Sequence, residues 1–333
     1  MTEPVLRVED LQAHFFAPEG VIKAVNGVSF ALERGSTLAI LGESGAGKTS
    51  VGLAILNLLP HPGRIVGGRV LLEGREITAL KAEELRQVRG REIAMIFQDP
   101  VSGLNPLLPI GTQVEEIIAS HLPLSRKETK RRSLELLSQM GLSDPEHMAS
   151  RYPFHLSGGM CQRVMIAIAT ALNPKVLIAD EPTSALDVTV QAAILQELTD
   201  LRRRYGTSVL LITHDIGVVA QMAEEVAVMY AGSIVESGKA ADVFRQPRHP
   251  YTWALLAARP RPDRNHGKPL PSIPGTAPNL AGLPDECPFL PRCPKALSLC
   301  RREPAPPLRE LSRGHMAACY NPVYVAETDA SLA

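Results

Sequence analysis

The chain has 333 residues, enough for one large or two smaller domains, and its 35 Lys and Arg residues balance 35 Asp and Glu residues. This balance argues against a protein whose whole surface binds nucleic acid, although a local basic patch is compatible with it. No apolar run approaches the ~18 residues that a membrane-spanning helix needs, and the acidic, polar start MTEPVLRVED lacks the pattern of a secretory signal. We therefore expect a cytosolic protein that reaches a membrane only through a partner.

Three segments near the N-terminus have the composition of β-strands. Residues 5–16 and 24–32 alternate imperfectly between apolar and polar side chains. Residues 69–77 have the pattern of a hairpin with a turn near Glu73 and Gly74. Together these segments predict an antiparallel sheet beside the part of the chain that follows residue 37.

Two adjacent aromatic residues, Phe15 and Phe16, lie in the first of these strands. One of the rings could stack on an adenine base. The commoner alternative for two adjacent aromatic residues is that both belong to the core.

The rest of the chain is organised around a short stretch between these strands. Residues 37–41 form an apolar run of strand length, and residues 51–58 have the length and apolar content of a helix. Between them, residues 42–49 read GESGAGKT and fit the pattern G-x-x-x-x-G-K-[ST]. A glycine-rich turn without a ligand is the alternative, but a strand before the loop and a helix after it favour a nucleoside triphosphate site.

The residue types in this loop suit phosphate chemistry. Gly42, Gly45 and Gly47 let the backbone curl so that successive N–H groups point inward as an anion nest, next to the positive end of a helix dipole. Lys48 supplies a charge for the β- and γ-phosphates, and the hydroxyl of Thr49 is a ligand for Mg²⁺.

Residues 93–97 are expected to form a buried strand that ends in Gln98, whose amide is able to reach a metal or an attacking water. Residues 111–141 are predicted to be helical. A run of basic residues lies in this region, and its spacing fits the solvated face of a helix. The run consists of Arg126, Lys127, Lys130, Arg131 and Arg132.

Residues 156–163, LSGGMCQR, begin another predicted helix. Ser157 is a good N-cap, and Gly158 and Gly159 directly after it expose N–H groups that could bind a second phosphate. An ordinary capped helix start is the simpler alternative. Cys161 in this stretch is expected to be a small buried residue and not a ligand.

Two more buried strands are followed by polar residues. Residues 175–181 end in Asp180, which suits the Mg²⁺ side of the site, and Glu181, which suits a general base. Residues 208–213 are followed by His214. Because ligands of open α/β sheets lie beyond the carboxyl ends of the strands, these three side chains and Gln98 are expected at the edge that holds the phosphate loop.

The C-terminal part changes in composition. Residues 226–235 predict a last hairpin, and a helical region at 242–258 is interrupted by Pro247 and Pro250. Nine prolines then lie between residues 260 and 291 and predict an extended segment outside the core.

Four of the five cysteines follow in this segment, at Cys287, Cys293, Cys300 and Cys319. They are separated by five, six and eighteen residues, so the tight C-x₂-C pairs of structural zinc sites are absent. Clustered cysteines in a reducing compartment favour a metal over disulfides. The spacing does not decide between zinc, a [4Fe–4S] cluster, and free or disulfide-bonded thiols.

The ordered set of motifs resembles the ATP-binding subunit of an ABC transporter. GESGAGKT, Gln98, LSGGMCQR, VLIADE, SALD and His214 have the order and spacing of that family over about residues 6–258, and LSGGxxQR is its signature. The resemblance implies an α/β fold: a P-loop NTPase ABC ATPase core in residues 1–258, with an antiparallel β subdomain and a helical subdomain at about 100–165. A Pro- and Cys-rich extension, residues 259–333, follows this core.

The resemblance also implies roles for single residues. Phe15 matches the aromatic residue that stacks on adenine, Glu181 the catalytic base and His214 the switch histidine. Asp180 is the Walker B aspartate and, with Thr49 and Gln98, would bind Mg²⁺; Gln98 would also sense the membrane subunits. The Walker A residues that would bind ATP are Gly42, Glu43, Ser44, Gly45, Ala46, Gly47, Lys48, Thr49 and Ser50.

Two further motifs point to a dimer interface. Ser157, Gly158 and Gly159 would bind the γ-phosphate of an ATP held by the opposite subunit, and Asp187 would belong to a loop that crosses this interface. Cys161 departs from the family pattern, which usually has a polar or basic residue there.

Three stretches of the tail, RHPYT at 248–252, LPSIPGTAPNL at 270–280 and CPFLPRC at 287–293, resemble the dipeptide/oligopeptide-type importers, which include nickel importers. This resemblance implies a [4Fe–4S] cluster on the four tail cysteines. It also implies a second, different ATPase subunit, two membrane permeases and an extracytoplasmic substrate-binding protein as partners. The expected location is the cytoplasmic face of the cell membrane.

Two alternatives to peptide import stay open. One is import of nickel or another small solute. The other is a non-transport ABC ATPase that acts on nucleic acid or ribosomes. Those proteins usually carry two cassettes or a long coiled-coil insertion, whereas this chain has one Walker A match and no heptad run, so no direct contact with nucleic acid is expected.

Overall fold

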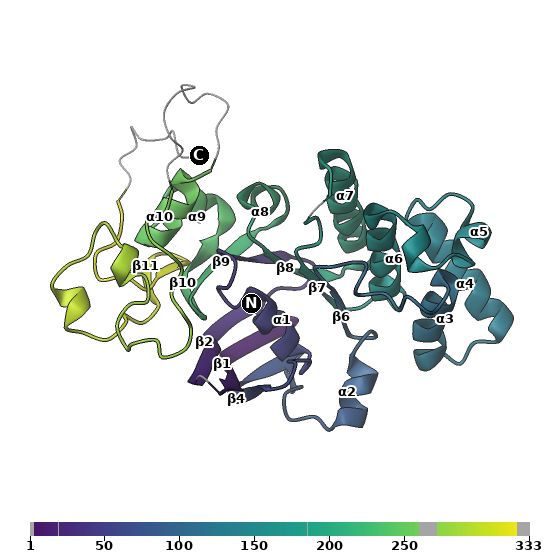
Figure 1. Ribbon diagram of the computed structural model, residues 1–333, viewed down its shortest axis with the longest axis horizontal. Coiled ribbons are helices and arrows are strands. Elements are labelled where there is room, and N and C mark those ends of the chain that lie inside the picture. Colours follow the sequence, from purple (N-terminus) through teal and green to yellow (C-terminus); the bar gives the residue numbers. More distant parts are fainter. Residues whose placement is uncertain (1–2, 19, 185, 260–271, 325–333) are drawn as a thin grey trace. The chain divides into compact units, whose positions relative to one another are not determined.

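The computed structural model describes residues 3–18, 20–184, 186–259 and 272–324. The chain divides into two compact units (Figure 1). The first is drawn from residues 1–7, 31–37 and 71–212, and the second from residues 8–30, 38–70 and 213–333. Ala185 of the SALD motif and residues 260–271 of the proline-rich segment lie outside the described residues.

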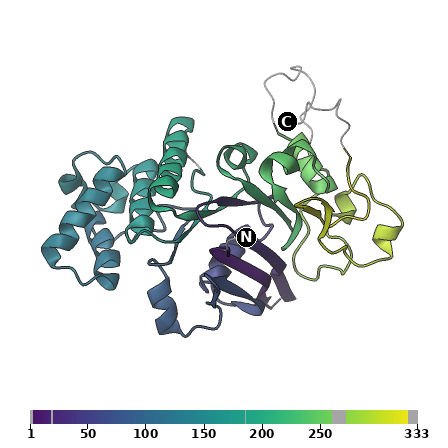
Figure 2. The same cartoon turned by 180° about the vertical axis from the view of Figure 1, so that it is seen from behind.

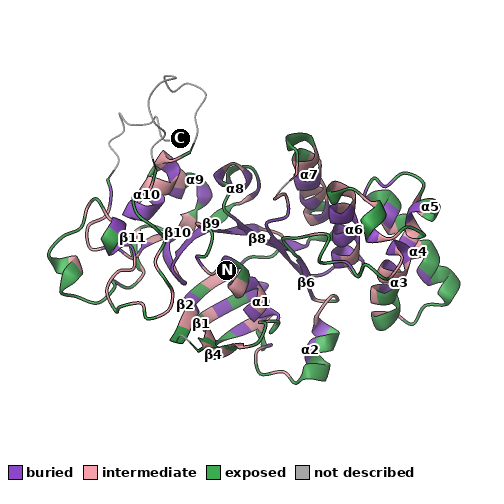
Figure 3. Ribbon diagram, viewed as in Figure 1, coloured by how far each residue is buried: buried purple, intermediate pink, exposed green. Residues whose placement is uncertain are grey.

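The first unit contains a parallel sheet of three strands. β7 (Val176–Asp180) lies between β6 (Ile93–Ile96) and β8 (Ser208–Thr213), and Ala179 pairs with Ile96 while Asp180 pairs with Ile212. Every residue of the three strands is buried (Figure 3). Such unbroken apolar runs are typical of parallel strands that are covered on both faces, so the three predicted strands are confirmed.

The first unit also contains most of the helices that precede β8. α2 (Ala82–Val88) is separate from a bundle formed by α3 (Ile110–His121), α4 (Arg126–Gln139), α5 (Pro145–Ala149) and α6 (Gly158–Thr170), which Figures 1 and 2 both show side by side. A short 3₁₀ turn, η1 (Pro153–His155), precedes α6, and α7 (Val188–Tyr205) follows β7.

The helical region predicted at 111–141 is two helices and not one. Pro123 stands in the break between them, and Ser125 begins α4 with a capping box in which Ser125 and Glu128 exchange hydrogen bonds. The basic run on α4 is exposed, as expected, except that Arg132 is half-buried and donates to the carbonyl oxygen of Ala171 at 2.8 Å.

The second unit contains the strand that leads into the phosphate loop. β3 (Thr37–Leu41) runs parallel to β9 (Glu225–Tyr230), and β10 (Ser233–Lys239) continues antiparallel to β9. The helices of this part are α1 (Lys48–Ile55), α8 (Ile216–Met222), α9 (Ala240–Arg245) and α10 (Pro250–Ala257).

The tail adds strands to the same sheet. β12 (His315–Ala317) pairs antiparallel with β10, and β11 (Arg309–Ser312) pairs with β12. The sequence analysis placed the last hairpin at β9–β10 and missed this one, because strands of four and three residues carry too short an alternating pattern. Two 3₁₀ turns, η2 (Leu290–Arg292) and η3 (Leu299–Arg301), lie earlier in the tail.

The antiparallel sheet predicted near the N-terminus is present. β1 (Leu6–Ala17) lies between β2 (Gly20–Leu32) and β4 (Gly63–Leu72), and β5 (Arg75–Glu76) pairs with the end of β4. The β4–β5 turn has positive φ at Glu73 and Gly74, 49° and 77°, as a two-residue type I′ hairpin requires. In the described part of the chain, no helix is both long and apolar enough to cross a membrane.

Candidate functional site

The predicted glycine loop connects β3 to α1. Gly47, with φ 98°, is the N-cap, and α1 begins at Lys48 and ends at Ile55. The helix expected at 51–58 therefore starts three residues earlier, because the polar residues Lys48, Thr49 and Ser50 hid its first turn from the apolar pattern. The first turn of a helix presents backbone N–H groups to an anion, so this start adds to the nest that the glycines form.

Two of the loop glycines allow backbone segments to approach closely. A Cβ at Gly42 would lie 2.3 Å from the carbonyl oxygen of Met229 in β9, and one at Gly47 would lie 2.0 Å from that of Ala24 in β2. The carbonyl of Ala46 also accepts a hydrogen bond from Gly232 N–H at 2.9 Å. The loop is thus fixed against the strands on either side of it.

The lysine of the loop lies along the loop itself. The Lys48 ammonium donates to the carbonyl oxygens of Gly42 at 2.8 Å and Glu43 at 3.0 Å, and the side chain is buried. Ser44, Gly45 and Thr49 are exposed, whereas Ser50 is half-buried. The outer side of the loop is therefore open to a ligand.

The strand ends of the first unit carry three of the predicted residues on one edge. Asp180 ends β7 and is 1% exposed, and Glu181 follows it and is 9% exposed. Gln98 lies two residues beyond β6 and is exposed. Because β6 and β7 are parallel neighbours, Gln98, Asp180 and Glu181 all lie at the carboxyl edge, as the sequence predicts.

Glu181 has an unusual backbone. Its φ is 48°, in the left-handed region that residues other than glycine rarely adopt, and its N–H donates to the carbonyl oxygen of Ile212 at 2.8 Å. Such a conformation costs of the order of 1–3 kcal/mol and tends to occur at functional sites. The strained turn ends the strand one residue before Glu181, so this carboxyl group leaves the sheet.

His214 lies one residue beyond β8 and is exposed. The next residue, Asp215, caps α8, because its carboxylate accepts from the N–H groups of Gly217 at 2.7 Å and Val218 at 3.3 Å. His214 therefore stands at the end of a strand, as predicted, and shortly before the start of α8, which was not predicted.

The LSGG stretch begins α6 as expected. Ser157 caps the helix by accepting from Met160 N–H at 3.3 Å, and a Cβ at Gly158 would meet nothing within 4 Å. A Cβ at Gly159 would approach Val190 of α7 to 3.1 Å. The helix start at Ser157 and Gly158 is thus exposed, while Cys161 is fully buried, which confirms the prediction for this cysteine.

The aromatic pair in β1 is not part of the core. Phe15 is half-buried, and its ring lies against Gly63, where a Cβ would approach it to 2.6 Å. Phe16 is 37% exposed and lies 4.1 Å beneath the guanidinium of Arg64. The alternative in which both rings are core residues is therefore wrong.

The four tail cysteines are free thiols that line one small cavity of about 20 Å³. Burial is the largest cause that raises the pKa of Cys287, Cys293 and Cys319, the last to about 11. Over the described ranges, no set of three or more His, Cys, Asp or Glu side chains is arranged to hold a metal ion. The four donors thus share a pocket and fit a thiolate centre by their chemistry, but their arrangement does not match a single ion.

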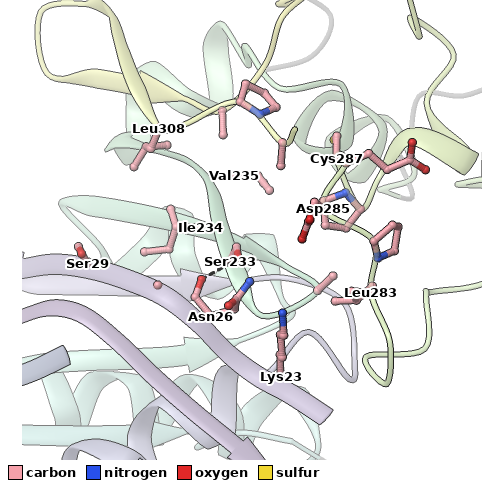
Figure 4. Close-up of a pocket in the computed structure, with 18 residues that line it drawn as sticks. Lys23, Asn26, Ser29, Ser233, Ile234, Val235, Leu283, Asp285, Cys287 and Leu308 are labelled. Atoms are coloured by element: carbon pink, nitrogen blue, oxygen red, sulfur yellow. Dashed lines mark hydrogen bonds between the residues drawn. The ribbon is translucent and has the colours of Figure 1, made fainter. Parts of the chain in front are cut away.

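A larger cavity of about 500 Å³ lies between β2, β10 and the tail (Figure 4). Lys23, Asn26, Asp285 and Cys287 are among its lining residues, and Ser233 donates to the carbonyl oxygen of Asn26 at 2.9 Å. No local sequence pattern marks this cavity, because its walls come from three distant segments.

Sequence reasoning missed two residues that touch the phosphate loop. Tyr251 lies in the stretch RHPYT, and its hydroxyl accepts a hydrogen bond from Glu43 N–H at 2.8 Å. Arg292 lies in CPFLPRC and donates to the Glu43 carboxylate at 2.8 Å. Both stretches were noticed as tail motifs, but nothing in them indicates a contact with a loop some two hundred residues away.

Comparison with known proteins decides the family. A family model described as ABC transporter matches residues 25–184, and one described as Oligopeptide/dipeptide transporter, C-terminal region, matches residues 235–300. The oligopeptide transport ATP-binding protein OppD of Salmonella typhimurium is 47% identical over 319 residues, which cover 96% of this chain and 94% of that protein. The chain belongs to the ABC transporter family.

Within that family, this ABC-type ATPase is of the oligopeptide/dipeptide type. The dipeptide transport ATP-binding protein DppD of Bacillus subtilis is 46% identical over 301 residues, 90% of each chain. The structure is similar to the dimeric, ADP- and Pi-bound ATP-binding cassette MJ0796, with a TM-score of 0.64 and 30% identity over 71% of this chain and 98% of that one. These findings confirm the predicted family and its α/β ABC ATPase fold, with ATP as nucleotide.

Proposed function

We propose that this ABC ATPase is the ATP-hydrolysing subunit of an importer for dipeptides and oligopeptides. The observation that carries the proposal is the oligopeptide/dipeptide tail at residues 235–300, joined to full-length similarity to OppD and DppD proteins. Its partners would be a second, different ATPase subunit, two membrane permeases and an extracytoplasmic binding protein. The subunit would then work at the cytoplasmic face of the membrane.

The phosphate loop would hold the triphosphate through the N–H groups of residues 42–50, and Lys48 would neutralise the β- and γ-phosphates. Three oxygen donors would bind Mg²⁺: the hydroxyl of Thr49, the carboxylate of Asp180 and the amide of Gln98. When bound, Mg²⁺ neutralises charge that develops on the phosphates. The half-buried ring of Phe15 is available to stack on adenine.

Glu181 would accept the proton of the attacking water, and His214 would orient the γ-phosphate. The strained φ of Glu181 and its place one residue beyond β7 support this assignment. Asp180, at the end of the strand, would bind the metal.

Ser157, Gly158 and Gly159 would bind the γ-phosphate of an ATP held by the partner subunit. The exposed start of α6, with no obstruction around Gly158, supports this role because a helix N-terminus attracts anions. In this arrangement, each nucleotide is sandwiched between two subunits, and hydrolysis requires the dimer.

Uptake measurements test the proposal. The chain is expected to restore uptake of a labelled tripeptide in a cell that lacks it, whereas Lys48→Met abolishes uptake and the matched surface variant Lys127→Met on α4 does not. Uptake of Ni²⁺ without uptake of peptides would show that the transported substrate is the metal ion and not a peptide. Stimulation of ATPase activity by RNA or ribosomes, and not by the permeases, would overturn the transport function.

We also propose a [4Fe–4S] cluster on Cys287, Cys293, Cys300 and Cys319. The four thiols share one cavity, and the resemblance of the tail to the dipeptide/oligopeptide-type importers implies a cluster on these cysteines. We prefer a cluster over zinc because of that resemblance alone, since four thiolates can bind either group.

The role of such a centre would be structural or redox-sensing. The proline-rich tail lacks a strong apolar pattern, and its ordering costs about 1–2 kcal/mol per residue in backbone entropy. Cross-links through four distant cysteines would offset this cost. The group would take no part in ATP hydrolysis.

Anaerobic purification followed by iron, sulfide and zinc analysis tests the cluster. Stoichiometric iron and sulfide are expected, lost in Cys300→Ser and kept in the control Cys161→Ser, whose cysteine is buried in another part of the chain. Stoichiometric zinc, or neither metal, in the anaerobic protein would refute it.

A further inference from the structure

One arginine of the tail reaches the phosphate loop. Arg292 ends η2, directly before Cys293, and is 8% exposed. Its guanidinium donates to both carboxylate oxygens of Glu43, at 2.8 Å and 3.2 Å. Glu43 is the second residue of GESGAGKT, so a half-buried ion pair with two hydrogen bonds joins the tail to the Walker A loop.

Glu43 is held at each of its polar atoms. Its backbone N–H donates to the hydroxyl of Tyr251 at 2.8 Å, and its carbonyl oxygen accepts from the ammonium of Lys48 at 3.0 Å and from Ala46 N–H at 3.2 Å. With both carboxylate oxygens bonded to Arg292, no polar atom of Glu43 lacks a protein partner. The first half of the loop is therefore fixed by this one residue.

Hydrogen bonds and aromatic rings hold the side chain of Arg292 in place. Its Nε donates to the carbonyl oxygen of Pro274 at 2.8 Å, and a further N–H lies 3.3 Å from the hydroxyl of Tyr230. The guanidinium also lies 5.9 Å and 6.0 Å from the ring centres of Tyr230 and Phe289. Tyr230, Phe289 and Tyr251 pack against one another and are buried, so the position of Arg292 is set by the core of this unit.

The charge of Glu43 explains why the ion pair matters for nucleotide binding. A carboxylate on the phosphate loop repels a triphosphate, and this repulsion is strong where water is partly excluded. Arg292 neutralises that carboxylate and at the same time fixes its position by two hydrogen bonds. A lysine would supply the charge but not the planar fork that meets both oxygens.

We propose that Arg292 is a positioning residue of the ATP site: through Glu43 it holds the Walker A loop ready for the phosphates and cancels the charge that would repel them. The tail that marks the oligopeptide/dipeptide type is then part of the nucleotide site. This inference does not depend on a metal at the cysteines or on the transported substrate.

Equilibrium binding of a fluorescent, non-hydrolysable ATP analogue with Mg²⁺ to the full-length chain tests the proposal. Arg292→Gln should weaken binding roughly tenfold, or about 1.4 kcal/mol. Glu43→Gln should weaken it only about twofold to threefold, because the repulsive charge is lost together with the ion pair. The double variant should match Glu43→Gln, since no carboxylate is left without its partner, and so should bind better than Arg292→Gln.

Three further measurements separate positioning from a general loss of structure. Arg292→Lys should recover part of the affinity, and the exposed control Arg313→Gln should bind as the unaltered chain does. In the assembled complex, Arg292→Gln should raise KM for ATP and leave kcat nearly unchanged, because Arg292 does not touch the reacting phosphate. Thermal unfolding without nucleotide shows whether each variant is folded; if Arg292→Gln is not, Arg292→Lys and the Glu43 variants carry the test.

Unaltered affinity in folded Arg292→Gln would overturn the proposal. A double variant whose fold-loss of affinity equals the product of the two single fold-losses would also overturn it. The unpaired charge of Glu43 would then not explain the weaker binding of Arg292→Gln. A fall in kcat with an unchanged KM would assign Arg292 a structural role only.

Discussion

Alanine at single glycines of the phosphate loop separates two effects that the structure distinguishes. Gly45 and Gly47 both have positive φ, +82° and +98°, which side chains rarely adopt. A Cβ at Gly45 meets nothing within 4 Å, whereas one at Gly47 lies 2.0 Å from the carbonyl oxygen of Ala24. Gly45→Ala therefore strains only its own backbone, and Gly47→Ala also forces the loop away from β2.

The magnitudes follow from these two terms. A left-handed conformation costs about 1–2 kcal/mol for a residue with a side chain. Overpacking adds about 1–3 kcal/mol, so Gly47→Ala should cost about 2–5 kcal/mol in all. In Gly45→Ala the contacts of Glu43 and Ala46 still hold the loop. The strain energy is therefore the same in the free and the ATP-bound state, and the affinity for ATP changes little. In Gly47→Ala the N–H groups move, and the cost falls on binding.

The assay is a titration of the full-length chain with a fluorescent ATP analogue. Gly45→Ala should bind within about threefold of the unaltered chain, and Gly47→Ala at least about 30-fold more weakly, which corresponds to the lower bound of about 2 kcal/mol. Gly314→Ala, with φ +71° and open space around the Cβ position in the β11–β12 turn, controls for backbone strain elsewhere. Equal affinity of the Gly45 and Gly47 variants would refute the reasoning.

Three further predictions concern other parts of the site. Glu181→Gln should keep ATP binding, lose turnover by about 10²–10⁴-fold and accumulate an ATP-bound dimer; near-normal ATPase activity of the assembled complex would contradict it. Ser157→Arg should impair hydrolysis of the ATP held by the partner more than binding to this chain; an isolated chain as active as the full complex would argue against a shared site. Arg163 lies 3.0 Å from Glu197, whose pKa burial raises above its usual value. A carboxyl with a raised folded-state pKa destabilises the fold increasingly as pH rises and it ionises, so the loss of melting temperature in Arg163→Ala should be larger at pH 8 than at pH 5; equal losses would show that the ion pair is unimportant.

The sequence by itself determined the family and the fold class and located the candidate site residues, because those signals are local. GESGAGKT, LSGGMCQR and the acidic pair after β7 each lie within a few residues, and buried parallel strands appear as short apolar runs. Element limits were less well determined. α1 begins at Lys48 and not at residue 51, because its first turn is polar and carries no apolar pattern.

Tertiary structure alone decided which parts of the chain the tail contacts. Arg292 and Glu43 are 249 residues apart, and each by itself is an ordinary charged residue. The cavity shared by the four cysteines and the pairing of β12 with β10 also bring together residues that are far apart in sequence. Such contacts depend on the path of the whole chain and on which groups burial brings together. Periodicity and motif spacing describe only neighbours in sequence, and so they gave no indication that the tail contacts the phosphate loop.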